Sequence, residues 1–242
     1  MKNNPWLDRR VVAFAHQGGA FEGPSSTLHA IGQAIALGAT GVELDVHATK
    51  DRKIVVCHDE TVDRTTNHVG EICNFTLAEI REMDNAYWWI EGDAATPGRA
   101  DHEYIHRGKA PANRAFGIAT LEEVSEAFPG VPLNMDIKRT APEVEPYEEL
   151  LANELRRLGR TDSPMDAIAL QVPTSFGEIE VVNQVFVDAA HNHGLAVHVW
   201  TINETPEMER LLDLGVDGII TDTPSPLVQL LTQRGVAWDG RL

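Results

Sequence analysis

Short runs of β-branched and apolar residues alternate with amphipathic, helix-like stretches along the chain. This alternation is typical of βα units around a parallel sheet, and it constrains the fold class more than any other feature. We therefore expect an α/β fold. With 242 residues, 43% of them hydrophobic, the chain is long enough for one substantial core, so we expect residues 1–242 to form a single domain.

The expected elements follow from the position of each run. Strands are expected at residues 11–16, 41–48, 54–58, 132–138, 167–172, 196–202 and 218–221. Helices are expected at residues 27–37, 77–83, 121–128, 142–158, 181–192 and 206–214. Only residues 50–52 separate the second and third strands, which leaves no room for a crossover helix, so these strands are expected to form an antiparallel hairpin. That hairpin would bring His58 beside Asp45.

One long segment, residues 85–115, lacks regular periodicity and is rich in aromatic residues, Gly, Pro and basic residues. Long connections without regular structure inside a compact domain are usually functional or disordered, and the aromatic residues favour a functional role. We interpret this segment as an inserted cap or lid.

Composition excludes several functions. The net charge of −17 argues against a nucleic-acid surface, which needs clustered Lys and Arg. No stretch approaches the length of a membrane span, and the polar first ten residues lack the apolar centre of a signal peptide, so we expect a cytoplasmic protein without stable membrane insertion. Cys57 and Cys73 are too few for a disulfide framework and are expected to be ordinary thiols. The sequence does not indicate an oligomeric state.

Two expected strands place carboxylates on one face. Glu43 and Asp45 alternate with apolar neighbours, and Asp136 does the same in the strand at residues 132–138. Converging carboxylates repel one another unless a cation neutralises them, and oxygen ligands suit one Mg²⁺ or Ca²⁺ ion. The alternative is that Glu43 and Asp45 face solvent on a half-exposed strand.

Two histidines stand at expected strand ends. His16 precedes Gln17-Gly18-Gly19, a loop whose glycines allow the backbone to approach a ligand closely, and His58 ends the hairpin. Two histidines near a bound cation can act as general base and general acid across a phosphodiester. The alternative for either histidine alone is a structural role.

Five short motifs carry a family resemblance, and they occur in order along the chain. They are His16-Gln17-Gly18, Pro24-Ser25-Ser26-Thr27, Glu43-Leu44-Asp45, His58-Asp59 and Asp136-Ile137-Lys138. The sequence resembles the glycerophosphodiester phosphodiesterase family, whose pattern runs His-Arg-Gly, Pro-Glu-Asn-Thr, Glu-Leu-Asp, His-Asp and Glu-Ile-Lys. The resemblance implies a TIM-type barrel that cleaves glycerophosphodiesters to glycerol 3-phosphate and an alcohol.

The resemblance also implies a role for each site residue. Glu43, Asp45 and Asp136 resemble the metal ligands, and His16 and His58 resemble the acid/base pair. Lys138 resembles a phosphate contact, Trp200 a wall of the pocket, and Gln17 occupies the position of the family arginine. Two rival functions stay open: a lysophospholipase D-like hydrolase that grips an acyl chain with residues 87–90, and a non-catalytic phosphodiester-binding protein.

Several departures from the family pattern bear on these roles. Gln17 replaces a charged phosphate donor by a neutral amide, Ser25 and Ser26 replace Glu and Asn, and Asp136 is one methylene shorter than the family Glu. In addition, residues 159–166 stand where the family has two further βα units, which leaves six barrel strands. Either the strand at residues 132–138 pairs directly with the strand at residues 167–172 to give a shortened barrel, or a segment is missing from the chain.

Overall fold

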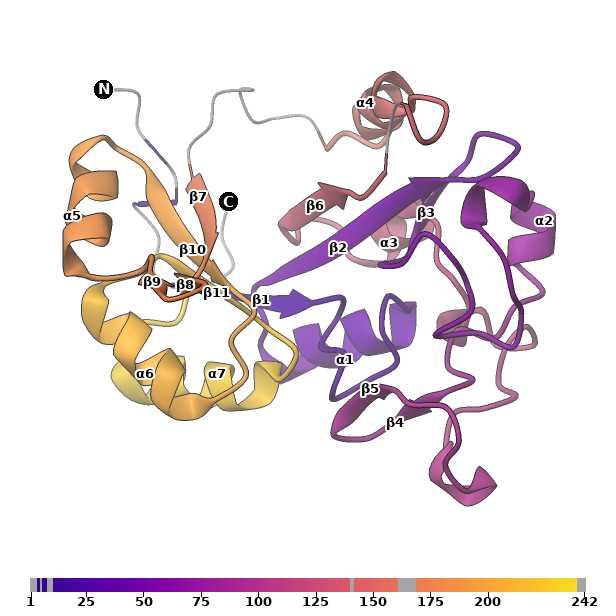
Figure 1. Cartoon of the computed structure of the whole chain (residues 1–242), viewed down its shortest axis with the longest axis horizontal. Helices are drawn as coiled ribbons and strands as arrows, with labels where there is room; N and C mark the ends of the chain where they lie inside the picture. Colours follow the sequence, from indigo (N-terminus) through magenta and orange to yellow (C-terminus); the bar gives the residue numbers. More distant parts are fainter. Residues whose placement is uncertain (1–3, 5, 8–10, 140–141, 161–168, 239–242) are drawn as a thin grey trace.

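One curved sheet forms the centre of the protein in the computed structural model, which describes residues 4, 6–7, 11–139, 142–160 and 169–238 (Figure 1). Its parallel strands are β1 (Val12–His16), β2 (Gly41–Ala48), β6 (Leu133–Ile137), β7 (Ala169–Pro173), β10 (Ala196–Trp200) and β11 (Gly218–Thr221). They lie in the order β6-β2-β1-β11-β10-β7. The predicted α/β class with a barrel-type parallel sheet is thereby confirmed.

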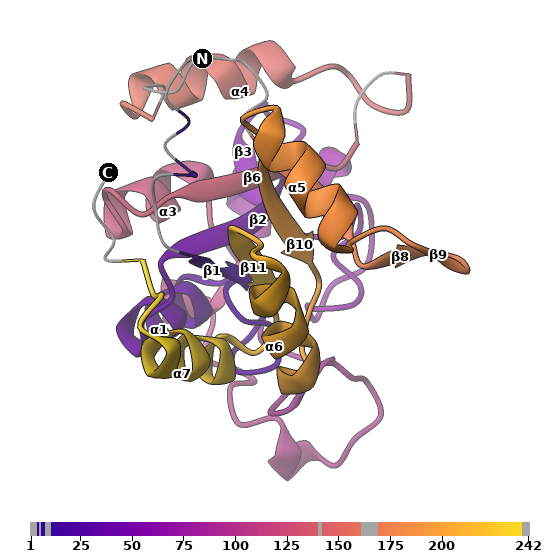
Figure 2. The same cartoon turned by 90° about the vertical axis from the view of Figure 1, so that its left-hand side faces the viewer.

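Helices cover the outer face of the sheet (Figure 2). They are α1 (Leu28–Leu37), α2 (Leu77–Ile80), α3 (Leu121–Ala127), α4 (Glu148–Arg157), α5 (Gln184–Asn192), α6 (Thr205–Leu214) and α7 (Pro224–Arg234). One core cluster packs β10 and β11 against α5, α6 and α7, and a second packs β2 against α1, α3 and α4. Because Val42, Leu44 and Val46 fill the second cluster, the alternate residues of β2 point to the inside of the curve. None of the helices in the described part of the chain is both long and apolar enough to cross a membrane.

Several element boundaries differ from the expected ones. The helix expected at residues 142–158 begins at Glu148, because Pro146 inside a helix would lack an amide donor and clash with the preceding turn. The helix expected from residue 181 begins at Gln184, where the Asn183 side chain accepts a hydrogen bond from the Phe186 amide. Helix α7 was not predicted, although Thr223 and Pro224 stand at its start and Gly235 at its end.

The predicted antiparallel hairpin is confirmed. Strand β3 (Ile54–Val56) pairs with the end of β2, with Val46 opposite Val56. Arg52 adopts a positive φ of 60° in the turn. The Cys57 amide donates to the Asp45 carbonyl at 3.0 Å, so the chain leading to His58 runs beside Asp45 as expected.

The sheet does not close between β6 and β7. Each strand pairs with a neighbour on one side only, and in the described ranges no backbone pairing joins them (Figure 1). The side chains of Asn134 and Gln171 bridge the opening with two amide hydrogen bonds of 3.1 and 2.9 Å. The prediction of a shortened barrel closed by direct pairing is therefore wrong for the described strand; residues 167 and 168 lie outside the described part. The protein has an open barrel.

The segment of residues 85–115 lies outside the central sheet, and its role as a cap or lid stays a prediction. It contains a short hairpin of β4 (Trp89–Ile90) and β5 (Asp93–Ala95), and the single turns η2 (Asp101–Glu103) and η3 (Arg114–Phe116). A third such turn, η1 (Ile72–Asn74), lies before it, and a second small hairpin, β8 (Ser175–Phe176) with β9 (Ile179–Glu180), projects beyond β7 (Figure 2). The insertion packs on α1 through His106, whose ring lies 5.0 Å from the ring of His29.

A histidine is buried inside the curve of the sheet. His198 on β10 is 2% exposed, and its ring lies 5.2 Å from the Phe14 ring and 5.5 Å from the Trp6 ring. Neither ring nitrogen has a hydrogen-bond partner among the described residues. Burial lowers the pKa of His198 to about 4, because the charged form would lose its hydration.

Because of the buried His198, we expect the free energy of unfolding to depend on pH. Between its ordinary pKa and the lowered one, the unfolded chain binds the proton and the folded chain does not, so the free energy of unfolding falls as the pH falls. Compared with His198→Leu, the wild-type protein is expected to lose about 2 kcal/mol more between pH 7 and pH 5. Urea unfolding of both proteins at the two pH values measures this. Equal losses would show that His198 titrates normally.

Candidate active site

A cavity of about 410 Å³ opens at the carboxyl ends of the strands. Its lining comes from the six parallel strands, the loops that follow them and the loop after β3: His16, Glu43, His58, Asn134, Met135, Asp136, Lys138, Gln171, Trp200, Thr201 and Ile220. In α/β barrels the strand ends on this side carry the functional side chains. The cavity therefore collects six of the eight site residues that the sequence singled out, and the buried Asp45 contacts one of them, Lys138.

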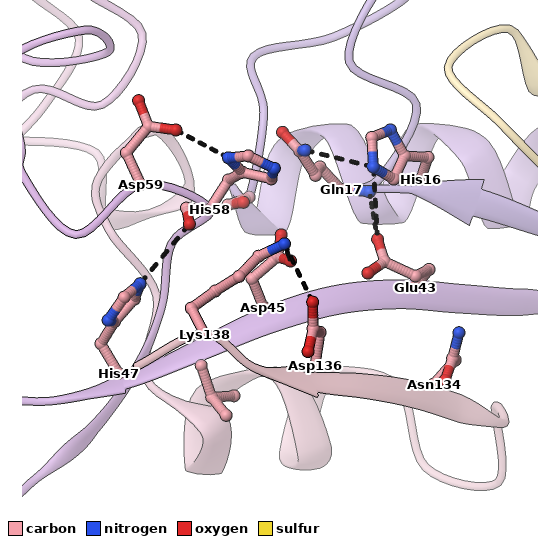
Figure 3. Close-up of polar contacts among 12 residues, drawn as sticks. His16, Gln17, Glu43, Asp45, His47, His58, Asp59, Asn134, Asp136 and Lys138 are labelled. Atoms are coloured by element: carbon pink, nitrogen blue, oxygen red, sulfur yellow. Dashed lines mark hydrogen bonds and ion pairs between the residues drawn. The ribbon is translucent and has the colours of Figure 1, made fainter. Parts of the chain in front are cut away.

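Asp45 and Lys138 form the charged centre of the site (Figure 3). Asp45 is fully buried, and its Oδ1 lies 2.8 Å from Nζ of Lys138, which also contacts Asp136 Oδ2 at 3.0 Å. The register of β2 and β6 explains this contact, because Asp45 stands opposite Asp136. Burial works against the charge of Lys138, but the two carboxylates outweigh it and raise the pKa of Lys138 to about 12.

Glu43 lies two residues before Asp45 on the same face of β2. Burial, together with repulsion from Asp45, raises the pKa of Glu43 to about 7. Its Oε2 lies 3.8 Å from Nε2 of His16, and the backbone amide of Gln17 donates a hydrogen bond to the same Oε2 at 3.4 Å. Two adjacent buried carboxylates of this kind are costly without a neighbouring cation.

The carboxylates suit a hard divalent ion in their chemistry. They are all oxygen donors, Glu43 and Asp45 are buried, and Asp45 Oδ2 has no hydrogen-bond partner among the described residues. As arranged, however, no three His, Cys, Asp or Glu side chains of the described ranges form a ready metal site. The Lys138 ammonium lies between Asp45 and Asp136, so it would have to move for both carboxylates to bind one ion.

His16 is held by a carboxylate from the neighbouring strand. Its Nδ1 lies 2.6 Å from Asp222 Oδ1, and Asn203 Nδ2 donates to the other oxygen of Asp222 at 2.9 Å. The parallel register of β1 with β11 pairs Ala15 with Thr221, which puts the next residues, His16 and Asp222, side by side. Burial lowers the pKa of His16, but the hydrogen bond to Asp222 and the nearby carboxylates outweigh it, so the pKa is raised overall.

His58 has the same kind of support from within its own loop. Its Nδ1 lies 2.6 Å from Asp59 Oδ1, and Arg64 binds both oxygens of Asp59 at 2.6 and 3.1 Å. Burial alone would raise the pKa of Asp59, but His58 and Arg64 hold it well below its usual range. The His16 and His58 rings lie 6.4 Å apart (Figure 3). In each histidine the carboxylate contacts Nδ1, which leaves Nε2 for another partner.

The remaining predicted site residues occupy different depths. Trp200 stands at the rim of the cavity and is 45% exposed. Gln17 is 5% exposed and lies behind His16, with its amide directed at His16 and Ser25 rather than at the cavity. No residue of the insertion at 85–115 lines the cavity; Trp88 and Tyr87 instead stack on Arg107.

Sequence reasoning missed the residues that hold the two histidines. Asp59 was noted only as part of the motif His58-Asp59, and Asp222, which directly follows an expected strand, was given no role. Asn203 was likewise unassigned. Asp222 could be recognised as a carboxylate at the end of a strand next to the strand of His16, but only once the strand order is known.

The open barrel and this cavity define a class: an α/β-barrel protein with paired carboxylates, two carboxylate-supported histidines and a lysine, a set suited to phosphodiester chemistry. The model of the glycerophosphoryl diester phosphodiesterase family matches residues 16–160 and 155–225. The chain belongs to this family.

Individual relatives agree with the family match. A glycerophosphodiester phosphodiesterase of Caldanaerobacter subterraneus is 30% identical over 262 residues, which cover 93% of this chain and 100% of the relative. One of Bacillus subtilis is 29% identical over 268 residues, covering 92% of this chain and 87% of the relative. Among solved structures, a phosphodiesterase of Oleispira antarctica in complex with sn-glycerol-3-phosphate superposes with a TM-score of 0.65 at 20% identity, covering 92% of this chain and 97% of that one.

The comparisons also bear on the opening between β6 and β7. The family match falls into two pieces that meet at residues 155–160. The matched lengths of 262 and 268 residues exceed the 242 residues of the chain, although part of the chain lies outside the match. The relatives therefore contain residues that this chain lacks. The boundary between the two matched pieces, at residues 155–160, lies between α4 and β7.

Asp222→Asn tests the support of His16. The substitution keeps the shape of Asp222 but removes the charged acceptor that holds Nδ1–H, so we expect turnover to fall by about two orders of magnitude or more. Asp217→Asn is a matched control, because Asp217 binds His191 at 2.8 Å outside the cavity. Hydrolysis of glycerophosphocholine by both variants is the measurement. Equal rates for the two variants would exclude a role of Asp222 in the site.

Proposed function

We propose that the protein hydrolyses glycerophosphodiesters to glycerol 3-phosphate and an alcohol, and that it requires one divalent cation, Mg²⁺ or Ca²⁺. The observation that carries the proposal is the pair Glu43 and Asp45, buried side by side between two carboxylate-supported histidines. The family membership and the relative in complex with sn-glycerol-3-phosphate support the substrate class.

Glu43, Asp45 and Asp136 are the residues that would hold the cation. When bound, a divalent ion of this kind stabilises negative charge on phosphoryl oxygens. His16 and His58 would carry the proton transfers at Nε2, since Nδ1 of each ring contacts a carboxylate. Lys138 supplies a positive charge that attracts the phosphate, and Trp200 contacts the substrate at the rim.

The two rival functions are less well supported. A non-catalytic binding protein would not need both histidines to be oriented by carboxylates. A lysophospholipase D that grips an acyl chain with residues 87–90 would need these residues at the cavity, yet Trp89 and Ile90 are buried in the insertion.

Activity is expected to depend on the cation. Excess EDTA should abolish glycerophosphocholine hydrolysis, and added Mg²⁺ or Ca²⁺ should restore it. Asp45→Asn should abolish activity, because a hard cation held by few protein ligands binds poorly after the loss of one negative charge. Full turnover in excess chelator would exclude the metal requirement.

His16→Ala and His58→Ala are each expected to slow turnover by about two to four orders of magnitude, the range for a missing general acid or base. His102→Ala is the control, because His102 is exposed in the insertion and does not line the cavity. Steady-state rates with glycerophosphocholine are compared. Near-normal turnover in either active-site variant would remove that histidine from the mechanism.

A further inference from the structure

The two loops that follow the candidate histidines start from strands that are not neighbours. The His16 loop, residues 17–27, follows β1, and the His58 loop, residues 58–66, follows β3, with β2 between the two strands. In the described part of the chain no hydrogen bond joins these loops directly. The His16 and His58 rings lie 6.4 Å apart, and both have to reach one phosphodiester. A third segment is therefore needed to fix one loop relative to the other.

Asn85, the first residue of the insertion at 85–115, bonds to both loops with one side chain. Its Nδ2 donates to the Ser25 carbonyl in the His16 loop at 2.9 Å, and its Oδ1 accepts from the Thr65 hydroxyl in the His58 loop at 2.5 Å. The side-chain amide has only this orientation, because the Ser25 carbonyl accepts and cannot donate. Asn85 is 2% exposed and Thr65 is 7% exposed, so both bonds are shielded from bulk water.

The bond to Ser25 leads back to His16 through the backbone of its loop. The Ser26 amide donates to the Gln17 carbonyl at 2.7 Å, and Gln17 directly follows His16. The stretch that Asn85 contacts is thus closed onto the residue next to the histidine. A shift of the Ser25 carbonyl would be felt at the end of β1.

The bond to Thr65 leads back to His58 through a salt bridge. Arg64, the neighbour of Thr65, binds both oxygens of Asp59 at 2.6 and 3.1 Å. Asp59 in turn contacts Nδ1 of His58 at 2.6 Å. The position of Thr65 therefore bears on the carboxylate that orients this ring.

Asn85 is itself anchored where the two ends of the insertion meet. Its backbone amide donates to the Phe116 carbonyl at 3.0 Å. The preceding Asp84 is 2% exposed and accepts from the Gly108 amide at 2.6 Å, while its own amide donates to Asn67 Oδ1 at 3.0 Å. The backbone beneath the Asn85 side chain is thus held from both sides.

We propose that Asn85 is a positioning residue that sets the separation of His16 and His58. Its side chain ties the two loops together without lining the cavity. The insertion would in this way take part in the reaction although none of its residues lines the cavity. The inference rests on the proposed function for its kinetic test only.

Asn85→Ala is the first test variant, because it leaves the Ser25 carbonyl and the Thr65 hydroxyl without the bridge. We expect kcat for glycerophosphocholine to fall by about ten- to a hundredfold, since a catalytic group misplaced by about 1 Å loses this much rate. KM should stay unchanged, because Lys138 is held by carboxylates of β2 and β6 and not by either loop. An unchanged kcat, or a raised KM at normal kcat, would overturn the proposal.

Trp89→Phe is the matched control for the loss of a buried hydrogen bond. Trp89 is 4% exposed, and its Nε1 donates to the Ala20 carbonyl at 2.9 Å, which ties the insertion to the His16 loop alone. Urea unfolding of both variants shows how far each is destabilised. If Trp89→Phe lowers kcat as much as Asn85→Ala, the bridge between the loops has no special role.

Thr65 variants approach the bridge from the other loop. Thr65→Val removes only the hydroxyl and should also lower kcat, whereas Thr65→Ser keeps the hydroxyl and should keep the rate. The double variant of Asn85→Ala with Thr65→Val should be no slower than Asn85→Ala alone, since both changes break the same connection. Losses that simply add would contradict a shared role.

Hydrogen exchange tests the bridge without turnover. Thr65→Val changes the His58 loop, yet it should also speed amide exchange in residues 17–27, where the Ser26 amide is bonded to the Gln17 carbonyl. Thr61→Val is the control, because Thr61 lies in the same loop and makes no hydrogen bond with Asn85. Faster exchange confined to residues 58–66 would overturn the coupling. If the wild-type protein hydrolyses no glycerophosphodiester, the proposed function fails, and the exchange result still decides whether Asn85 couples the loops.

Discussion

The site depends on one electrostatic constraint, the burial of Asp45 and Glu43 on the inner face of β2. A buried carboxylate needs a cation or hydrogen-bond donors, and the described structure gives Asp45 the Lys138 ammonium at 2.8 Å. Lys138 reaches Asp45 because β6 pairs with β2 in parallel register. The pairing of β6 with β2 therefore decides which charged side chains meet at the cavity. A divalent ion bound to Asp45 and Asp136 would compete with Lys138 for the same oxygens, so it would change the position of this lysine.

The histidines depend on a second constraint, the orientation of an imidazole by its Nδ1. Asp222 orients His16 across two paired strands, whereas Asp59 orients His58 within one loop. The first arrangement requires the sheet to be assembled, and the second requires only the hairpin and Arg64. The two supports differ in how far they depend on the fold, although in both the carboxylate contacts Nδ1 of the ring.

Local patterns predicted most of the elements and the residues of the cavity, because alternation along a strand decides which side chains share a face. Glu43 and Asp45 could be placed on the inner face of β2 from Val42 and Leu44 alone. Strand order and register could not be predicted in this way, since they depend on contacts between distant segments. That is why Asp222 and Asn203 were missed. Gln17 was assigned to the substrate from the family resemblance, and its side-chain amide lies 3.3 Å from His16 Nε2. The metal ligands, the roles of the histidines and the single domain stay predictions.

The open barrel concerns the site directly, because β6 is both an edge strand and the carrier of Asp136 and Lys138. In the described residues β6 pairs with β2 alone, and Asn134 with Gln171 provides its one link to β7. Asn134, Asp136 and Lys138 alternate along one face of the strand, so the amide bridge and the charged residues act on the same side. From β2, Asp45 contacts Lys138, and from β7, Gln171 bonds to Asn134. In the described residues only side-chain hydrogen bonds join β6 to β7, so the position of Lys138 depends on its ion pair with Asp45 on one side and on the amide pair of Asn134 and Gln171 on the other.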